Sequence, residues 1–161
     1  MPDDDARVFA PLSAQEEDLL RALARALVFV PRALESDIGS KYDLSMSELF
    51  ALMHLSDAAA GSLRMGDLAA RSALTLGAVT RVVKLLERKG LVERRPSPSD
   101  GRGHEAVLTA AGHDRLEAVR PAQVASARRR VLDKLDGVDL RAATAMLSVL
   151  SQDDGAGRPT P

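Results

Sequence analysis

The spacing of apolar side chains predicts a long N-terminal helix. Ser13 and Glu16 stand three residues apart just ahead of an apolar run, which is the sequence signature of a helix-capping box. The apolar residues of that run alternate steps of three and four, as in a seam between packed helices: Leu20, Leu23, Leu27, Val30 and Leu34. Pro31 interrupts the seam, so a kink or a break is predicted there. The seam fits packing within the chain as well as packing against a second copy.

Three shorter helices are predicted in the middle of the chain. Ser45 and Glu48 form a second capping box, which opens a helix that stops before residues 58–61. A short helix follows at residues 65–71, and after a brief turn Thr75 is a suitable N-cap for the third. The apolar stripe of this third helix consists of Val79, Val82, Val83 and Leu86.

The residues after the third helix predict a β-hairpin and then more helix. Residues 91–95 and 105–109 favour strands, and residues 96–103 between them are rich in turn formers. A long helix is predicted over residues 110–135, with a bend at Pro121. A last helix is marked by Leu140, Ala143, Leu147 and Leu150.

This order of elements predicts a mainly α protein with a small β-hairpin wing. A winged helix-turn-helix lobe is flanked by N- and C-terminal helical regions. The expected divisions are a flexible N-terminus (1–12), an N-terminal helix (13–41), the lobe (42–109), the C-terminal helices (110–151) and a tail (152–161). The tail is expected to be disordered because it is short, polar and rich in glycine and proline.

Composition narrows the function classes. The 161 residues suffice for one compact domain with appended helices, and with only 2% aromatic residues the core must be aliphatic. The absence of cysteine excludes disulfides, thiolate nucleophiles and cysteine-based zinc sites. No apolar run approaches the ~20 residues that cross a bilayer, and the acidic start (residues 3–5) is unlike a secretory signal. A cytoplasmic protein without membrane association is expected.

Charge is distributed unevenly along the chain. The formal net charge is only −1, but residues 71–104 hold eight basic and three acidic side chains, a net charge of +5. The rest of the chain therefore carries −6. Such asymmetry favours one segment that meets a polyanion, although a solvated charged surface is the alternative.

The predicted order of helix, turn, helix and basic hairpin is suited to reading duplex DNA. The second helix of such a pair enters the major groove, about 12 Å wide, so the side opposite its apolar stripe must be narrow and polar. That side carries residues four, three and four positions apart: Gly77, Arg81, Lys84 and Arg88.

Each position along this helix suggests a role. The small Gly77 and Ala78 allow the backbone to approach DNA closely. Thr80 and Arg81 are expected to reach base edges, since arginine suits bidentate contact with guanine. Phosphate contacts are expected from the side chains of Lys84 and Arg88 and from the exposed amide groups near Thr75.

The hairpin supplies a second arm. Its cations and hydroxyls can follow the DNA backbone, and they belong to Arg94, Arg95, Ser97, Ser99 and Arg102. Arg102 at the tip is expected to enter an adjacent minor groove, whose negative potential attracts arginine. Asp100 would face phosphates, so we expect it to pair with a nearby arginine or to close the turn.

These stretches resemble the MarR family of bacterial regulators. The recognition helix of that family is matched by residues 79–81 and 85–87 with Gly90, and its wing by residues 91–95, 100–103 and 107–109. Residues 45–55 and 65–69 fit the two preceding helices. The residues that would shape the tip of the wing are Asp100, Gly101 and Gly103. The likeness covers roughly residues 15–150.

The resemblance implies an obligate homodimer whose dimer region is formed by residues 13–41 and 110–151 of both chains. It implies a transcriptional repressor on a palindromic double-stranded DNA operator, with half-sites about one helical turn apart. It also implies Arg102 as the minor-groove residue. Release would follow when a small anionic or phenolic effector binds between the dimer region and the lobe.

One feature departs from the family pattern. Relatives often carry serine at the start of the recognition helix, whereas Gly77 and Ala78 offer no side-chain donor. Base recognition is therefore expected to depend more on Thr80, Arg81 and DNA shape.

The site of such an effector is open to two interpretations. His54 either lines a pocket or is a partly buried structural histidine, and the second is favoured. The other residues of the predicted pocket are Arg25, Phe29, Tyr42, Phe50 and Met53.

Other functions are less well supported. His104 and His113 lack the usual zinc-ligand spacing, so no metal or other cofactor is expected. No nucleophile, base and orienting partner come together, so an enzyme is not expected. The main alternative is a winged-helix module that binds protein, and the +5 segment favours DNA over it.

Overall fold

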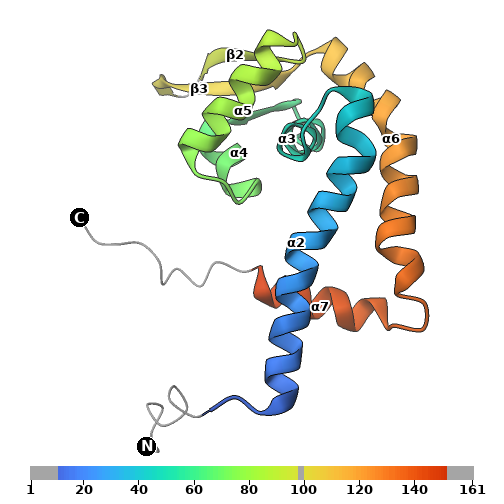
Figure 1. Ribbon diagram of the computed structural model, residues 1–161. Helices are drawn as coiled ribbons and strands as arrows, with labels where there is room; N and C mark the ends of the chain where they lie inside the picture. Colours follow the sequence, from blue (N-terminus) through green and yellow to red (C-terminus); the bar gives the residue numbers. More distant parts are fainter. Residues whose placement is uncertain (1–10, 98–99, 152–161) are drawn as a thin grey trace, which may run out of the picture.

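The computed structural model describes residues 11–97 and 100–151, with only the backbone described for Ser40 and residues 100–102. In chain order the elements are α2 (Ala14–Tyr42), α3 (Met46–Ser56), β1 (Ser62–Arg64), α4 (Met65–Arg71), α5 (Leu76–Arg88), β2 (Val92–Ser97), β3 (Asp100–Leu108), α6 (Ala110–Arg130), the 3-10 helix η1 (Leu132–Lys134) and α7 (Leu140–Leu150). The helices α3, α4 and α5 and the sheet form a lobe, and α2 and α6 run from it toward α7 (Figure 1). The predicted fold class is confirmed.

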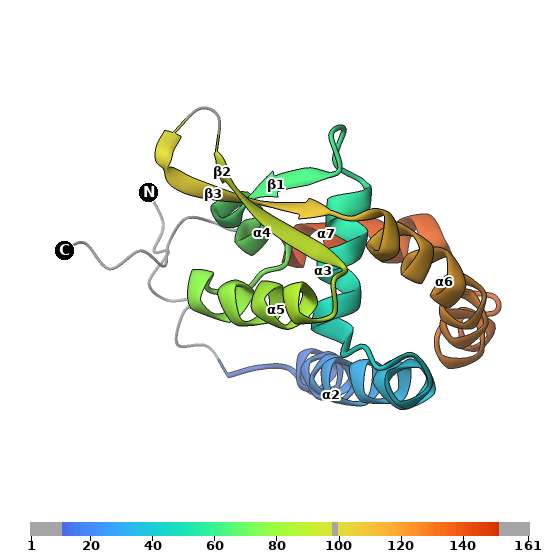
Figure 2. The ribbon, with the colours of Figure 1, turned by 90° about the horizontal axis from the view of Figure 1, so that it is seen from above.

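The sheet is small and antiparallel, with strand order β1-β3-β2. In the hairpin Val92 pairs with Leu108 and Arg95 with Glu105, and on the other edge of β3 Ser62 pairs with Val107. Seen from above, the hairpin projects from the lobe beyond α4 and α5, on the side away from α2 and α6 (Figure 2). The sequence did not predict β1, because three residues are too few to show an alternating pattern.

The predicted helix starts are confirmed. In the first capping box the Glu16 carboxylate accepts from the Ser13 amide at 2.8 Å, and the Glu16 amide donates to the Ser13 hydroxyl. The second box, between Ser45 and Glu48, has the same two bonds. Thr75 accepts a hydrogen bond from the Ala78 amide as the N-cap of α5. Each box satisfies two amide donors that the first helical turn leaves without a partner.

The structure corrects two expectations about the helices. Of the kink or break predicted at Pro31, the break is absent, because α2 continues through it from Ala14 to Tyr42. Pro31 is exposed, so its ring and its missing N–H group face solvent. The long C-terminal helix ends at Arg130 instead of residue 135, because the backbone of Val131 leaves the helical region and η1 follows.

The predicted wing loop is too long. Residues 96–103 were assigned to a turn, but β2 reaches Ser97 and β3 begins at Asp100. A register shift between Pro96 and Ser97 lets the ladder continue past the proline, which has no amide to donate. Turn-forming residues therefore extend the hairpin here.

The hydrophobic core lies in the lobe and along the adjoining ends of α2 and α6. Its fully buried side chains include Ile38, Leu49, Leu52, Leu55, Leu68, Val79, Val83, Leu86, Val92 and Val119. By contrast, α7 has no buried residue, and neither does the first half of α2. Among the described residues, no helix combines the length and the hydropathy needed to span a bilayer.

An ionic cluster holds α2 against α6. The Asp37 carboxylate accepts hydrogen bonds from Arg130 at 2.7 and 2.9 Å, from the Ser126 hydroxyl at 2.6 Å and from Arg129 at 2.8 Å. The hydrogen bonds from Arg130 are the main reason that the pKa of Asp37 lies far below its usual range, and the Ser126 hydroxyl adds to the effect. The cluster fixes α6 beside the last turns of α2.

Gly112 provides a test of how tightly α6 meets the lobe. A Cβ at this position would lie 2.2 Å from the Leu91 carbonyl oxygen. We expect Gly112→Ala to lower the free energy of unfolding by about 1–3 kcal/mol, as overpacking does. Gly66→Ala is the control, because a Cβ there meets nothing within 4 Å. Urea unfolding at one fixed protein concentration measures both, and equal stability of the two variants would contradict the close approach.

Candidate nucleic-acid interface

The helix-turn-helix is built by α4, a turn of four residues (72–75) and α5. The Leu74 amide donates to the Ala69 carbonyl across the turn, and Ala73 adopts a left-handed backbone with φ of 50°. Leu68 on α4 and Val83 on α5 are fully buried in the same core. The turn and this packing hold α5 across the lobe with one side of the helix outward.

The outward side of α5 is cationic, as predicted. Gly77, Arg81, Lys84 and Arg88 are all exposed, and Val79 and Val83 on the opposite side are buried. Among the described residues, no carboxylate lies within ion-pair distance of Arg81, Lys84 or Arg88. No acidic residue occupies the first turn of α5 either. Three cations on one exposed face are therefore available to an anionic partner.

Unlike the arginines of α5, Arg94 and Arg95 of the wing have carboxylate partners. The Arg94 guanidinium pairs with Glu87 of α5 at 2.7 Å, and that of Arg95 pairs with Glu93 at 2.9 Å. The first pair joins the wing to the recognition helix, whereas the second lies within β2 and is well exposed. Arg94 thus braces the wing against α5, and Arg95 remains the more accessible cation.

The prediction that Ser97 faces DNA is wrong. Ser97 is only 4% exposed, and its hydroxyl donates to the Glu105 carboxylate at 3.0 Å. It joins the two strands of the hairpin instead. Gly103 is half-buried in β3. The side-chain predictions for Ser99, Asp100, Gly101 and Arg102 lie outside the described residues.

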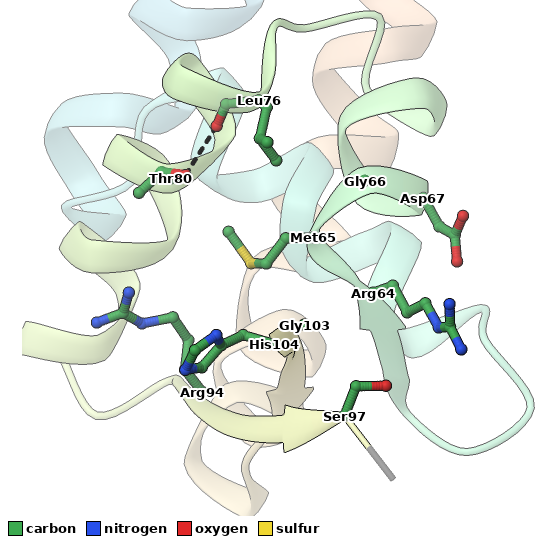
Figure 3. A pocket seen from close by; sticks show the side chains of 10 residues that line it. All are labelled: Arg64, Met65, Gly66, Asp67, Leu76, Thr80, Arg94, Ser97, Gly103 and His104. Atoms are coloured by element: carbon green, nitrogen blue, oxygen red, sulfur yellow. Dashed lines mark hydrogen bonds between the residues drawn. The ribbon is translucent and has the colours of Figure 1, made fainter. Parts of the chain in front are cut away.

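A groove of about 500 Å³ separates α5 from the wing. Leu76 and Thr80 line it from α5, Met65 from the start of α4, and Arg94 and His104 from the hairpin (Figure 3). Sequence reasoning missed Leu76, which stands at the first position of α5, three residues before the buried Val79 and seven before the buried Val83. Its spacing continues the apolar stripe of the helix, so nothing in the sequence indicated that this leucine would be exposed. It is 56% exposed.

A second ionic junction ties the recognition helix to the end of α2. Lys89, the C-cap of α5, lies 2.9 Å from a Glu48 carboxylate oxygen and donates to the Asp43 carbonyl. The Tyr42 carbonyl beside it accepts from Arg115 of α6 at 2.8 Å. The last carbonyls of α2 thus receive one cation from α5 and one from α6, which fixes the angle of α5 relative to α2.

Glu48 is the buried member of this junction. Burial alone would favour its neutral form, but hydrogen bonds from Ser45 and the Lys89 cation outweigh that effect and lower its pKa below the ordinary value. Its side chain is 5% exposed and that of Lys89 is 25% exposed. Glu48 therefore stays charged at neutral pH and depends on Lys89 for compensation.

The residues predicted for an effector pocket are spread over α2 and α3. Phe29 is 63% exposed and Phe50 is 44% exposed, whereas His54 is half-buried. Met53 lines a small cavity of about 80 Å³ with Leu116, Arg120 and Gln123 of α6. Tyr42 and Met53 also pack against the core, and Arg25 is exposed. The pocket stays a prediction.

Comparisons with known proteins agree with this geometry. The MarR family profile matches residues 42–103, from the end of α2 into β3 of the wing. An HTH-type transcriptional regulator of Mycobacterium leprae is 33% identical over 123 residues, which are 76% of this chain and 76% of that protein.

Solved structures extend the likeness to nearly the whole chain. Sco3205, a MarR family transcriptional regulator from Streptomyces coelicolor solved in complex with DNA, superposes with a TM-score of 0.86 and 26% identity, covering 94% of this chain and 98% of that one. CouR from Rhodococcus jostii, solved with p-coumaroyl-CoA bound, has the same fold at 21% identity, with a TM-score of 0.72 and coverage of 93% and 100%.

A helix-turn-helix with an exposed cationic second helix, followed by a β-hairpin wing, defines a winged-helix DNA-binding protein. The matching family profile and the regulator of Mycobacterium leprae make the assignment specific. The chain belongs to the MarR family of transcriptional regulators.

The Lys89 junction leads to a prediction for stability and its pH dependence. We expect Lys89→Met to lower the free energy of unfolding by about 1–3 kcal/mol at pH 7, because it leaves Glu48 buried without its cation. A lowered folded-state pKa of Glu48 means that the pair stabilises above the ordinary value of 4.5, and that this stability is lost as the pH falls below it. The difference between wild type and variant should therefore shrink below about pH 4.5.

Denaturant unfolding at pH 7 and pH 4 measures this effect, and Lys89→Arg is the control because it keeps a cation at the junction. A Lys89→Met variant as stable as wild type at pH 7, or a difference that grows in acid, would contradict the proposed compensation.

Proposed function

We propose that this regulator is a homodimeric repressor that binds a palindromic DNA operator and is released by a small anionic or phenolic effector. The observation that carries the proposal is the outward face of α5, where Arg81, Lys84 and Arg88 are exposed without a carboxylate partner among the described residues. Duplex DNA offers the dense negative charge that such a face requires.

Each element has a role in this proposal. Arg81, in the first half of α5, contacts a base edge, and Lys84 and Arg88 contact phosphates. The amide groups at the start of α5 bind a further phosphate, although the Ala78 amide is already used by the Thr75 cap. Arg95 follows the DNA backbone from the wing, and Arg102 enters the minor groove.

The proposed dimer is supported by the apolar surface of the helices outside the lobe. Leu20 and Leu27 of α2 are exposed, as are Leu147 and Leu150 of α7. A largely apolar groove of about 590 Å³ lies between these helices. Monomeric soluble proteins rarely expose a large continuous apolar patch, so a second copy is the natural cover. The seam predicted over residues 20–34 then packs mainly between chains.

The effector part of the proposal is supported by the position of the Met53 cavity. This cavity lies between α3 of the lobe and α6, which leads to α7. A compound that binds better to a dimer with wrongly spaced lobes would shift the population away from DNA. That CouR has been solved with p-coumaroyl-CoA agrees with a ligand-responsive fold.

Electrophoretic mobility of the chain's own promoter region tests the proposal. We expect a shift at protein concentrations below a micromolar that weakens steeply as salt is raised, because phosphate contacts release counterions. No salt-sensitive shift near a micromolar would contradict DNA binding and would favour a winged-helix module that binds protein.

Arg81→Ala separates base contact from charge. We expect it to cost about 1–3 kcal/mol of binding free energy on the operator and much less on random DNA. Lys84→Ala, three residues along the same exposed face, is the matched control. It should weaken binding to the operator and to random DNA alike. The slope of log affinity against log salt concentration should fall by about one for each lobe. Equal losses on both DNAs for Arg81→Ala would make Arg81 a phosphate contact.

A further inference from the structure

Leu76 continues the apolar stripe of α5, but the core does not cover it. At 56% exposure it is the most exposed large apolar side chain among the described residues of the lobe. It stands at the first position of α5, where the N-terminal residues of a recognition helix face base edges. Most of the other exposed leucines lie on α2 and α7, the helices that a second copy would cover, whereas Leu76 belongs to α5 of the lobe (Figure 1).

Thr80 lies one helical turn beyond Leu76, and both side chains line the groove between α5 and the wing. Its hydroxyl donates to the Leu76 carbonyl oxygen at 2.8 Å, as Figure 3 shows. The only proton of the hydroxyl is therefore engaged within the helix. In this arrangement Thr80 offers a base a methyl group and oxygen lone pairs, because its proton is already donated to the Leu76 carbonyl oxygen.

The start of α5 is otherwise poor in polar side chains. Gly77 and Ala78 carry no donor or acceptor, and the cationic side begins at Arg81. In the major groove each base pair shows hydrogen-bonding groups, and the 5-methyl group of thymine is the one apolar group among them. An exposed leucine and a threonine methyl fit that group and no other base-edge feature.

We propose that Leu76 and Thr80 are specificity-determining residues that contact the 5-methyl group of a thymine in each half-site, next to the base read by Arg81. The proposal rests on the proposed DNA binding and adds a base identity to it. Burial of one methyl group raises the affinity about fourfold. Two symmetric half-sites together raise it about fifteenfold.

The test uses deoxyuridine, which pairs like thymidine and lacks only the methyl group. An operator is first selected by the full-length protein from a random duplex pool. Each thymine is then replaced by uracil, singly and in symmetric pairs, and affinities are measured by fluorescence anisotropy. We expect one symmetric pair of replacements to weaken binding about fifteenfold and the others to have little effect.

Variants assign that loss to the two side chains. In Leu76→Ala the uracil and thymine operators should bind with nearly equal affinity. Thr80→Ser, which keeps the hydroxyl and removes the methyl group, should reduce the difference in part. Leu85→Ala is the matched control, because Leu85 is an exposed leucine of the same helix, 37% exposed and two and a half turns further on, and it should keep the full dependence.

The outcomes separate this inference from the function on which it rests. If no thymine in the selected operator responds to uracil, or if the response persists unchanged in Leu76→Ala, then Leu76 does not read a methyl group. A failure to select any duplex would instead contradict the proposed DNA binding itself.

Discussion

The packing of the apolar side of α5 into the lobe is the constraint on which the rest of the site depends. Val79, Val83 and Leu86 are at most 2% exposed, so the helix has one rotational setting about its axis. A rotation that hid the arginines would bring these three side chains into water, at about 1.5–3 kcal/mol for each. The core therefore decides which side chains can meet DNA, and Arg81, Lys84 and Arg88 face outward as a consequence of burial.

The charges around α5 are arranged so that its outward side stays cationic in a protein whose net charge is −1. The acids nearest to it are used within the lobe: Glu87 holds the wing through Arg94, and Glu48 holds the end of α5 through Lys89. Glu93 pairs with Arg95 on the strand. In each of these pairs one cation of the basic segment is neutralised by a carboxylate of the lobe. Among the described residues of the basic segment, three of the four cations without a carboxylate partner lie on α5, and the fourth is Arg71 at the end of α4. The electrostatic attraction is therefore concentrated on α5, the helix whose orientation the core fixes.

Local features of the sequence predicted the helices well, because each depends on residues three or four positions apart. The two capping boxes, the Thr75 cap and the outward face of α5 all follow from such spacing. The features that were missed depend on distant residues. Ser97 is buried by its partner across the hairpin, and the role of Lys89 depends on Asp43 and Glu48, more than forty positions away. The strand β1 exists only because β3 offers it an edge.

The two ionic junctions connect the lobe to the helices on which the proposed dimer is built. Asp37 holds α6 to α2, and the last carbonyls of α2 accept from Arg115 of α6 and from Lys89 of α5. These links all converge on the last two turns of α2. In a dimer built on α2 and α7, the two recognition helices would then be separated by stiff helices with ionic bonds at their ends. Because DNA accepts only a narrow range of half-site spacing, the proposed effector between α3 and α6 would need to shift the end of α2 only slightly to prevent binding.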